Sequence, residues 1–274
     1  MKIFAIRNHD LGDDRDLGFF FYHEHGDGSY IELMEDVDEW DLPFILDHYA
    51  RAGRRTVSPS HTLAFIRQRV IPSDRQNIGM ILRDNGLETY DEFRLFILSD
   101  GRCAQDECYI RQISPSALPE SILLRRRRRL ISAATANNGS WLLGFADGRT
   151  ALLEPETCRR ENTVFERLLR YRRCFDHLQL TEGGAALSPD GQCEITYDLL
   201  YEHSSPLPFD MKTLEAFALS QLVTAPDLAQ QLDCSRQNIS DLVRRGRLEP
   251  LPLNARVQIF SKTACDKLMY EINP

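Results

Sequence analysis

The chain lacks any long apolar run, although 42% of its 274 residues are hydrophobic. A helix that crosses a bilayer needs about 20 consecutive apolar residues, and no segment approaches that length, so we expect no membrane partner. The N-terminal residues turn polar too early for a secretory signal. The seven cysteines are scattered, without a Cys-x-x-Cys pair or a Cys/His cluster, which argues against a disulfide framework and a zinc site. We therefore expect a reduced, cytoplasmic protein.

Catalytic patterns are equally scarce. His23 and His25 would share one face of a strand, but no third ligand follows at a spacing typical of a metal site. Cys174, Asp176 and His177 lie close in the sequence, yet a strand would divide them between its two faces. We accordingly predict no catalytic residue, no bound metal and no cofactor.

A pair of short helices is predicted between residues 223 and 248. Thr224 is a candidate N-cap of the first helix, and Pro226 suits its first turn. After a tight Asp-Cys break, Ser235 caps the second helix and Gly246 ends it. The apolar positions that would face each other are Leu228, Ala229 and Leu232 on the first helix and Ile239, Leu242 and Val243 on the second.

The outward positions of the second helix carry Arg, Gln and Asn, which can form paired hydrogen bonds with guanine and adenine edges. A short strand over residues 255–260 and a last helix over residues 262–270 follow. This order resembles the excisionase-like and MerR-like winged helix family, in which the second helix enters the major groove and a hairpin wing touches the DNA backbone. The resemblance implies double-stranded DNA as the partner. The DNA-binding residues it implies are Ser235, Arg236, Gln237, Asn238 and Ser240 at or near the bases, and Arg244, Arg245, Arg247 and Arg256 near phosphates. The other interpretation is a helical hairpin used for protein contacts or as a scaffold.

Positive charge is also in short supply, because the net charge is −8. Residues 1–120 hold 13 Lys and Arg against 22 Asp and Glu, whereas residues 222–274 hold 7 basic and 6 acidic side chains. The acidic N-terminal part should avoid phosphates, and the C-terminal part can approach them with modest affinity per subunit. This balance favours a homodimer on a two-fold DNA site.

The first 120 residues alternate strand and helix signals. Strands are predicted at residues 1–6, 17–22 and 29–33, the last two as a hairpin, and helices at residues 42–52, 61–70, 73–86 and 90–98. The passages Arg69–Ile78 and Gly101–Ile110 resemble the small N-terminal subdomain of HipA-type toxin kinases. No Gly-rich phosphate loop and no catalytic Asp followed by a metal-binding Asn accompany them, so phosphoryl transfer is not expected.

Five consecutive arginines, Arg125–Arg129, separate this part from the next. They could contact a phosphate or nucleic acid, or they could form a solvated strand or linker whose partners are carboxylates of the first segment. Beyond them, residues 131–136 and 141–145 predict a hairpin, and residues 164–171 predict a helix. The passage Gly144–Arg149, with Gly183-Gly184 and Ile195–Glu202, resembles the DUF2442 family. Those are small α+β domains without known catalysis, often encoded beside toxin–antitoxin genes or fused to helix-turn-helix domains.

Together these patterns predict a multi-domain α+β protein. The expected domains are an acidic α/β domain over residues 1–122, a DUF2442-like α+β domain over residues 123–209 and a winged helix-turn-helix over residues 210–274. The function expected from them is that of a bacterial DNA-binding transcriptional regulator without catalysis. The alternative is an antitoxin or adaptor that binds a protein partner through the acidic N-terminal domain.

Overall fold

The computed structural model describes residues 1–12, 15–24, 28–136, 138–158, 178–189, 193–252 and 256–272. The protein is of mixed α and β structure and forms two compact units, Met1–Pro208 and Phe209–Pro274. The first unit therefore contains, apart from Phe209, both segments that the sequence assigns to separate domains, 1–122 and 123–209. No helix in the described part of the chain combines the length and the apolar character needed to cross a lipid bilayer.

The first unit contains a five-stranded antiparallel sheet with the order β4-β3-β2-β1-β5. Its strands are β1 (Lys2–Asn8), β2 (Asp16–Tyr22), β3 (Tyr30–Leu33), β4 (Thr56–Val57) and β5 (Cys108–Ile113). The hairpin predicted from residues 17–33 is present as β2 and β3. Both faces of this sheet are buried: Phe20 and Tyr22 pack on one side of β2, and Phe19 and Phe21 pack on the other. Residues 19–22 of β2 are consequently four consecutive aromatic residues rather than an alternation of apolar and polar side chains.

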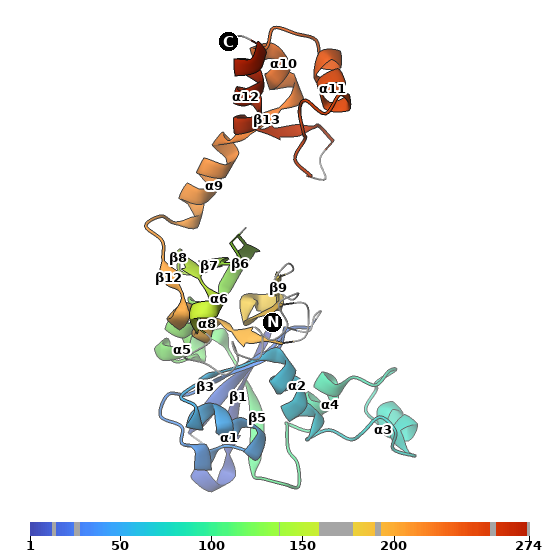
Figure 1. Cartoon of the computed structure of the whole chain (residues 1–274). Coiled ribbons are helices and arrows are strands. Elements are labelled where there is room, and N and C mark those ends of the chain that lie inside the picture. Colours follow the sequence, from blue (N-terminus) through green and yellow to red (C-terminus); the bar gives the residue numbers. More distant parts are fainter. Residues whose placement is uncertain are drawn as a thin grey trace. The chain divides into compact units, whose positions relative to one another are not determined.

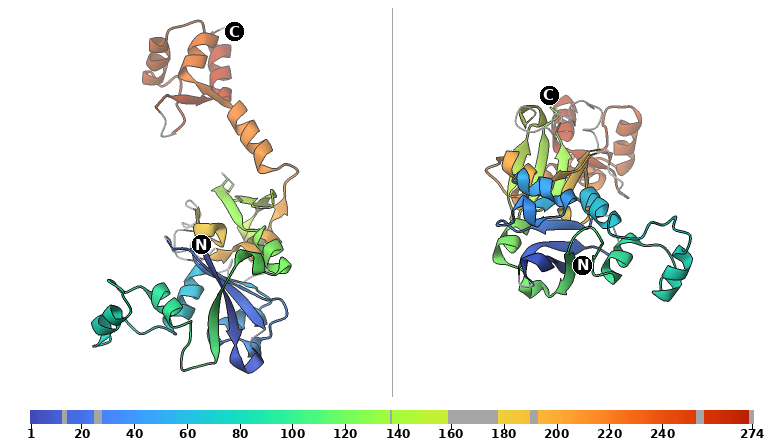
Figure 2. Two further views of the ribbon diagram at one scale, coloured as in Figure 1. Left: turned by 180° about the vertical axis from the view of Figure 1, so that it is seen from behind. Right: turned by 90° about the horizontal axis from the view of Figure 1, so that it is seen from below.

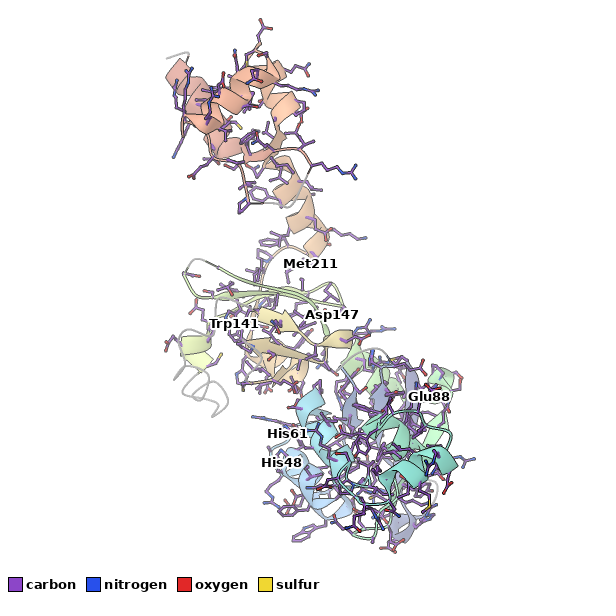
Figure 3. All side chains as sticks on the ribbon, turned by 90° about the vertical axis from the view of Figure 1, so that its right-hand side faces the viewer. His48, His61, Glu88, Trp141, Asp147 and Met211 are labelled. Carbon is purple, nitrogen blue, oxygen red and sulfur yellow. The ribbon has the colours of Figure 1, made fainter. Side chains whose placement is uncertain are left out.

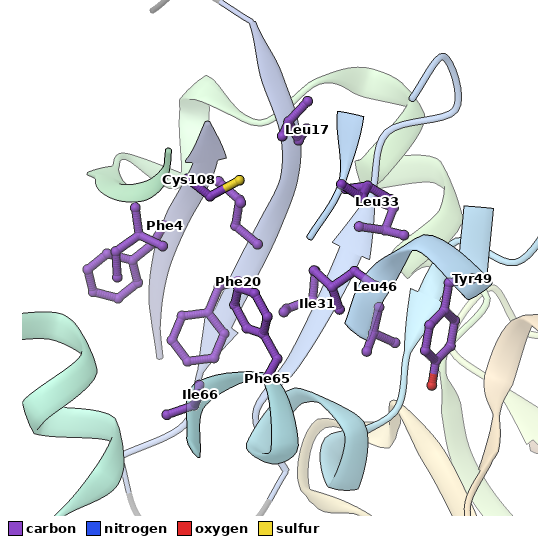
Figure 4. Packing of buried hydrophobic residues seen from close by; sticks show 14 of the residues in the cluster. Phe4, Leu17, Phe20, Ile31, Leu33, Leu46, Tyr49, Phe65, Ile66 and Cys108 are labelled. Carbon is purple, nitrogen blue, oxygen red and sulfur yellow. The ribbon is translucent and has the colours of Figure 1, made fainter. Parts of the chain in front are cut away.

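Helices cover one face of the sheet, as Figures 1 and 4 show. They are α1 (Phe44–Arg51), α2 (Pro59–Arg67) and α4 (Glu92–Leu98). Leu46 and Tyr49 of α1 and Phe65 of α2 pack with Phe4 and Phe20 in this core. The other face packs against α5 (Glu120–Arg126), which contributes Ile122.

One helix of the first unit contributes nothing to the core. Helix α3 (Ile78–Asp84) has no buried residue, and it lies away from the sheet in both Figure 1 and Figure 2. The sequence predicts this helix from Ser73 onward. It begins instead at Ile78, after Asn77, whose side chain makes no capping hydrogen bond.

The rest of the first unit contains two smaller sheets around a second core. One sheet has the order β12-β8-β7-β6, and the other has the order β11-β10-β9. Their strands are β6 (Leu130–Thr135), β7 (Trp141–Phe145), β8 (Thr150–Leu153), β9 (Leu178–Leu180), β10 (Ala186–Pro189), β11 (Ile195–Thr196) and β12 (Ser205–Pro206), accompanied by helices α6 (Pro155–Cys158) and α8 (Tyr197–His203). The hairpin predicted at residues 131–145 is present as β6 and β7. Strand β12 pairs antiparallel with β8. The helix predicted at residues 164–171 lies outside the described residues.

Two glycines allow chain segments of the first unit to touch. A Cβ atom on Gly184 would lie 1.9 Å from the carbonyl oxygen of Leu130, and one on Gly28 would lie 2.2 Å from that of Glu182. Both distances are far below van der Waals contact. These contacts bring residues 28, 130 and 182–184 together, so the loops near the two cores are packed backbone against backbone.

A buried carboxylate connects the parts of the first unit. Glu32, on β3, is 0% exposed and accepts hydrogen bonds from the Tyr197 hydroxyl at 2.8 Å, the Thr56 hydroxyl at 3.2 Å and the Arg125 guanidinium at 3.1 Å. Burial raises the pKa of Glu32 to about 7, although the charge of Arg125 opposes that rise. The three donors come from α8, β4 and α5. The carboxylate therefore connects the five-stranded sheet, which includes β4, with α8, which belongs to the second core.

The arginine run is not a strand or a simple linker. Its first two members belong to α5. Arg125 is buried, where it donates to Glu32, to Glu35 at 3.3 Å and to the Leu33 carbonyl at 2.7 Å. Arg126 stacks on the Phe21 ring, with its guanidinium carbon 4.1 Å from the ring centroid. The interpretation that pairs this run with carboxylates of the first segment therefore holds for Arg125.

The second unit is a small helical unit with a two-stranded sheet (Figure 1). Its elements are α9 (Met211–Ser220), β13 (Leu222–Thr224), α10 (Ala225–Gln231), α11 (Arg236–Arg244), β14 (Ile259–Ser261) and α12 (Lys262–Ile272). Strands β13 and β14 pair antiparallel. The core lies between them and helices α10, α11 and α12, and it includes Val223, Leu228, Ile239, Phe260 and Leu268. Helix α9 has no buried residue.

The buried arginine gives a direct stability prediction. Arg125→Met should lower the free energy of unfolding by about 3–5 kcal/mol, because it leaves the Glu32 carboxylate buried without its cation. Arg127→Met is the matched control, since Arg127 belongs to the same run but is exposed, and it should change stability by no more than about 0.5 kcal/mol. Urea unfolding of both variants measures the difference. Equal losses would show that the Glu32–Arg125 pair contributes nothing particular.

Candidate nucleic-acid interface

Local hydrogen bonds define both ends of α10. Thr224 is its N-cap, and the Thr224 hydroxyl oxygen accepts a hydrogen bond from the Asp227 amide at 3.3 Å. Pro226 stands in the first turn, where a missing amide proton costs nothing. After α10, Asp233 adopts a φ of 46°, and the Cys234 amide donates to the Ala229 carbonyl at 2.9 Å. The chain therefore reverses in a few residues, as its sequence predicts.

Helix α11 is capped equally clearly. The Ser235 side chain accepts a hydrogen bond from the Asn238 amide at 3.3 Å. At the other end, Gly246 has a φ of 68°, the Gly246 amide donates to Val243 at 2.9 Å, and the Arg247 amide donates to Leu242 at 3.0 Å. This pair of bonds satisfies the last free carbonyls of a helix and requires a left-handed residue, for which glycine is best suited.

Packing fixes the rotation of α11 about its own axis. Ile239 is 0% exposed, and Leu242 and Val243 are partly buried against the same core. With 3.6 residues per turn, the opposite side of the helix is centred on Gln237 and Arg244. The sequence pattern predicts this division, because its apolar positions alone point to one side.

All nine residues that the sequence assigns to DNA binding are exposed. They are Ser235, Arg236, Gln237, Asn238, Ser240, Arg244, Arg245, Arg247 and Arg256. Seven of them belong to α11 or its two caps, Arg247 follows directly, and Arg256 lies shortly before β14. The hydroxyl of Ser235 is already engaged as the helix cap, and that of Ser240 donates to the Arg236 carbonyl at 3.2 Å.

Asp241 is a further residue on the outer side of α11, and it is absent from the assigned set. Its carboxylate pairs with Arg244 at 2.7 Å. The Asp-x-x-Arg spacing on a helix is the sequence signal that could have identified this pair. Arg244 is consequently partly neutralised, whereas Arg236, Arg245 and Arg256 have no carboxylate partner within the described ranges.

The strand after α11 is shorter than predicted, and its partner lies elsewhere. Residues 255–260 were expected to form a strand, and β14 spans Ile259–Ser261. Its ladder partner is β13, which precedes α10. The Leu251 amide also donates to the Ile259 carbonyl at 2.8 Å. The tip between these segments, residues 253–255, lies outside the described part of the chain.

The first unit contains a cluster of two histidines and a tyrosine. His48 and His61 lie near each other (Figure 3), with ring centroids 5.7 Å apart, and the Tyr49 hydroxyl contacts His61 Nδ1 at 2.6 Å. Burial lowers the pKa of His61, and the neighbouring His48 lowers it further. Among the described residues, no three His, Cys, Asp or Glu side chains are grouped to hold a metal ion. His25 is outside those residues.

Two open cavities, of about 290 and 310 Å³, lie in the first unit. The first is lined by Gly53, Arg55, Arg125, Arg128, Asp198, Tyr201 and Glu202, and the second by Phe4, Ile97, Asp100, Arg102, Tyr109, Ile110, Arg111 and Gln112. Neither set of lining residues includes a serine, cysteine or histidine.

Comparison with known proteins adds no assignment, since no protein-family model, no curated protein and no solved structure matches the chain.

The end of α11 can be tested by substitution. Gly246→Ala should destabilise the helix end by about 1–2 kcal/mol, because a side chain disfavours a positive φ, even though a Cβ atom there would meet no other atom within 4 Å. Gly79→Ala is the matched control: Gly79 also has open space but lies inside α3 without a positive φ. That change should stabilise by about 0.5–1 kcal/mol. Amide hydrogen exchange of each helix is the measurement, and unchanged exchange in α11 would contradict the expectation.

Proposed function

We propose that this protein is a DNA-binding transcriptional regulator that reads an operator through α11 and performs no chemistry. The proposal rests chiefly on the rotation of α11: its apolar side packs into the core of the second unit, while Arg236, Gln237 and Asn238 of its first turn are exposed. In helix-turn-helix proteins, the N-terminal residues of the second helix contact base edges. Helices α10 and α11 fit that role, with β14 and the segment before it as the wing.

The chemistry of these side chains supports base reading. Arginine can donate two hydrogen bonds to O6 and N7 of guanine, and asparagine or glutamine can pair with N6 and N7 of adenine. Asp241 suits the same surface, since a carboxylate can accept a hydrogen bond from N4 of cytosine. Each good contact of this kind discriminates against a wrong base by about 1–3 kcal/mol.

Phosphate contacts would come from Arg245, Arg247 and Arg256. Residues 222–274 carry seven basic and six acidic side chains, so the attraction of one subunit for DNA is weak. A homodimer that spans two half-sites about 34 Å apart would double the number of contacts. The acidic first unit would oppose unspecific binding, which depends almost entirely on phosphate contacts.

Selection of genomic DNA fragments by the purified protein, at two salt concentrations and with sequencing of the bound pool, tests the function. We expect enrichment of one two-fold-symmetric site, with binding that weakens as salt rises. Weak, unselective binding that salt abolishes would contradict the proposal and favour a protein-binding role.

Arg236→Ala should weaken binding to the selected site by about 1–3 kcal/mol and leave the fold intact.

Asp241→Asn should strengthen binding to unspecific DNA, since it frees Arg244 from its ion pair and removes a negative charge beside the phosphates. Fluorescence anisotropy with labelled duplexes measures both effects. Met80→Ala, an exposed and uncharged change on α3 of the first unit, is the control. Equal affinity of Arg236→Ala and the unaltered protein would refute the role of this side chain.

A further inference from the structure

Two aromatic side chains of the first unit are almost fully exposed. Trp40, in the short helix η2 (Glu39–Asp41), is 86% exposed, and Phe44, the first residue of α1, is 88% exposed. These are the highest values for large hydrophobic side chains in the described part of the chain. The two residues are only four positions apart. A contiguous exposed apolar patch rimmed by polar residues marks an interaction site, and tryptophan is enriched among the residues that contribute most to binding energy.

Their exposure does not result from a loosely attached loop. Val37, Leu42 and Leu46 are buried in the core beside these positions, and Pro43 between them is buried as well. Asp38 caps η2 by accepting a hydrogen bond from the Trp40 amide at 3.4 Å. Figure 4 shows Leu46 and Tyr49 on the core side of α1. Buried neighbours therefore hold the backbone of this segment in place, and the side chains of Trp40 and Phe44 point into solvent.

The surroundings of the two rings are strongly acidic. Residues 35–47 contain six carboxylates and no Lys or Arg. Arg51 pairs with Glu39 at 2.7 Å and with Asp47 at 3.2 Å, and Arg15 pairs with Asp41 at 2.8 Å.

Glu35 pairs with Arg125 at 3.3 Å. The two remaining carboxylates of this segment, those of Asp36 and Asp38, are exposed and form no ion pair within the described ranges, although Arg15 donates to the backbone carbonyl of Asp36 at 3.4 Å. The rings therefore lie beside two carboxylates that form no ion pair.

We propose that Trp40, Phe44, Asp36 and Asp38 form an aromatic–acidic surface that binds a basic amphipathic segment of another protein. Apolar side chains of that segment cover the two rings. Its Lys or Arg side chains pair with the two aspartates and lie over the face of the indole, which attracts cations. This role goes beyond the reading of DNA and does not depend on it.

Charge excludes the other obvious occupants. A nucleic acid would bring phosphates against the carboxylates. A second copy of this chain, in a two-fold contact, would place the same residues against each other, and the aspartates would repel. A basic partner alone gains from both the rings and the charges.

The two tryptophans of the chain allow a direct test. Trp141 is 0% exposed and lies in β7 within the first unit (Figure 3), so a change in emission on binding reports Trp40. The full-length protein is titrated with a short synthetic amphipathic peptide of Lys and Leu. We expect a saturable shift of the emission to shorter wavelength that weakens with salt. A peptide with Glu in place of Lys should produce no shift, and one with Ser in place of Leu should bind at least about tenfold more weakly.

Variants locate the site. Phe44→Ala should weaken the Lys–Leu peptide about tenfold, as expected for loss of a central aromatic contact. Asp36→Asn combined with Asp38→Asn should weaken it several-fold and remove most of the salt dependence, while the amide oxygen introduced at position 38 can still accept the capping hydrogen bond. Met80→Ala, which alters a side chain 51% exposed on α3, is the control and should bind like the unaltered protein. Urea unfolding of each variant verifies the fold.

Two results would overturn the proposal. The first is no emission shift with the Lys–Leu peptide, and the second is equal affinity of Phe44→Ala and Met80→Ala for that peptide.

Discussion

A carboxylate that is removed from water must be surrounded by donors, and this constraint unites the first unit. Glu32 has no exposed surface, and its three donors lie on β4, α5 and α8. Residues 32, 56, 125 and 197 are distant in the sequence, and none of these polar groups can leave without stranding another in the interior. This explains why residues 1–208 are one compact unit, although the arginine run in the sequence suggests a boundary at residues 122–123.

Elements whose signals lie within a few residues of each other can be predicted from the sequence, whereas strands whose partners lie far away in the sequence cannot. Both hairpins could be found, because alternation and turn residues lie within a few positions. The caps Thr224, Ser235 and Gly246 could be found for the same reason. Strand β5 was missed because its partner, β1, lies about 100 residues earlier. Strand β13 could not be found for the same reason, because Leu222 pairs with Ser261, which lies much later in the chain. Arg125 could not be distinguished from its four neighbours by sequence, since it is the rotation of α5, which ends at Arg126, that turns the Arg125 side chain inward.

The candidate DNA surface shows the same limit. The apolar positions of α11 fix which side is buried, so the exposure of the seven assigned residues in α11 and its caps could be predicted. The contacts that these side chains make within the protein could not be predicted: Ser235 caps the helix, and Arg244 forms an ion pair with Asp241. The six carboxylates of residues 35–47 are divided likewise: four pair with arginines, and Asp36 and Asp38 form no ion pair within the described ranges. The proposed DNA-binding and protein-binding roles would thus use opposite charges on separate units.

The contacts at Gly28 and Gly184 have a consequence for mutagenesis. A library that randomised the whole chain and selected for a folded product would return glycine at both positions, since any Cβ atom would collide with the backbone of Glu182 or Leu130. Neither glycine belongs to a proposed binding surface. The requirement for glycine at these positions would reflect the close approach of two chain segments rather than contact with a ligand. It would distinguish residues needed for folding from residues such as Arg236 or Phe44, whose role only a binding assay can reveal.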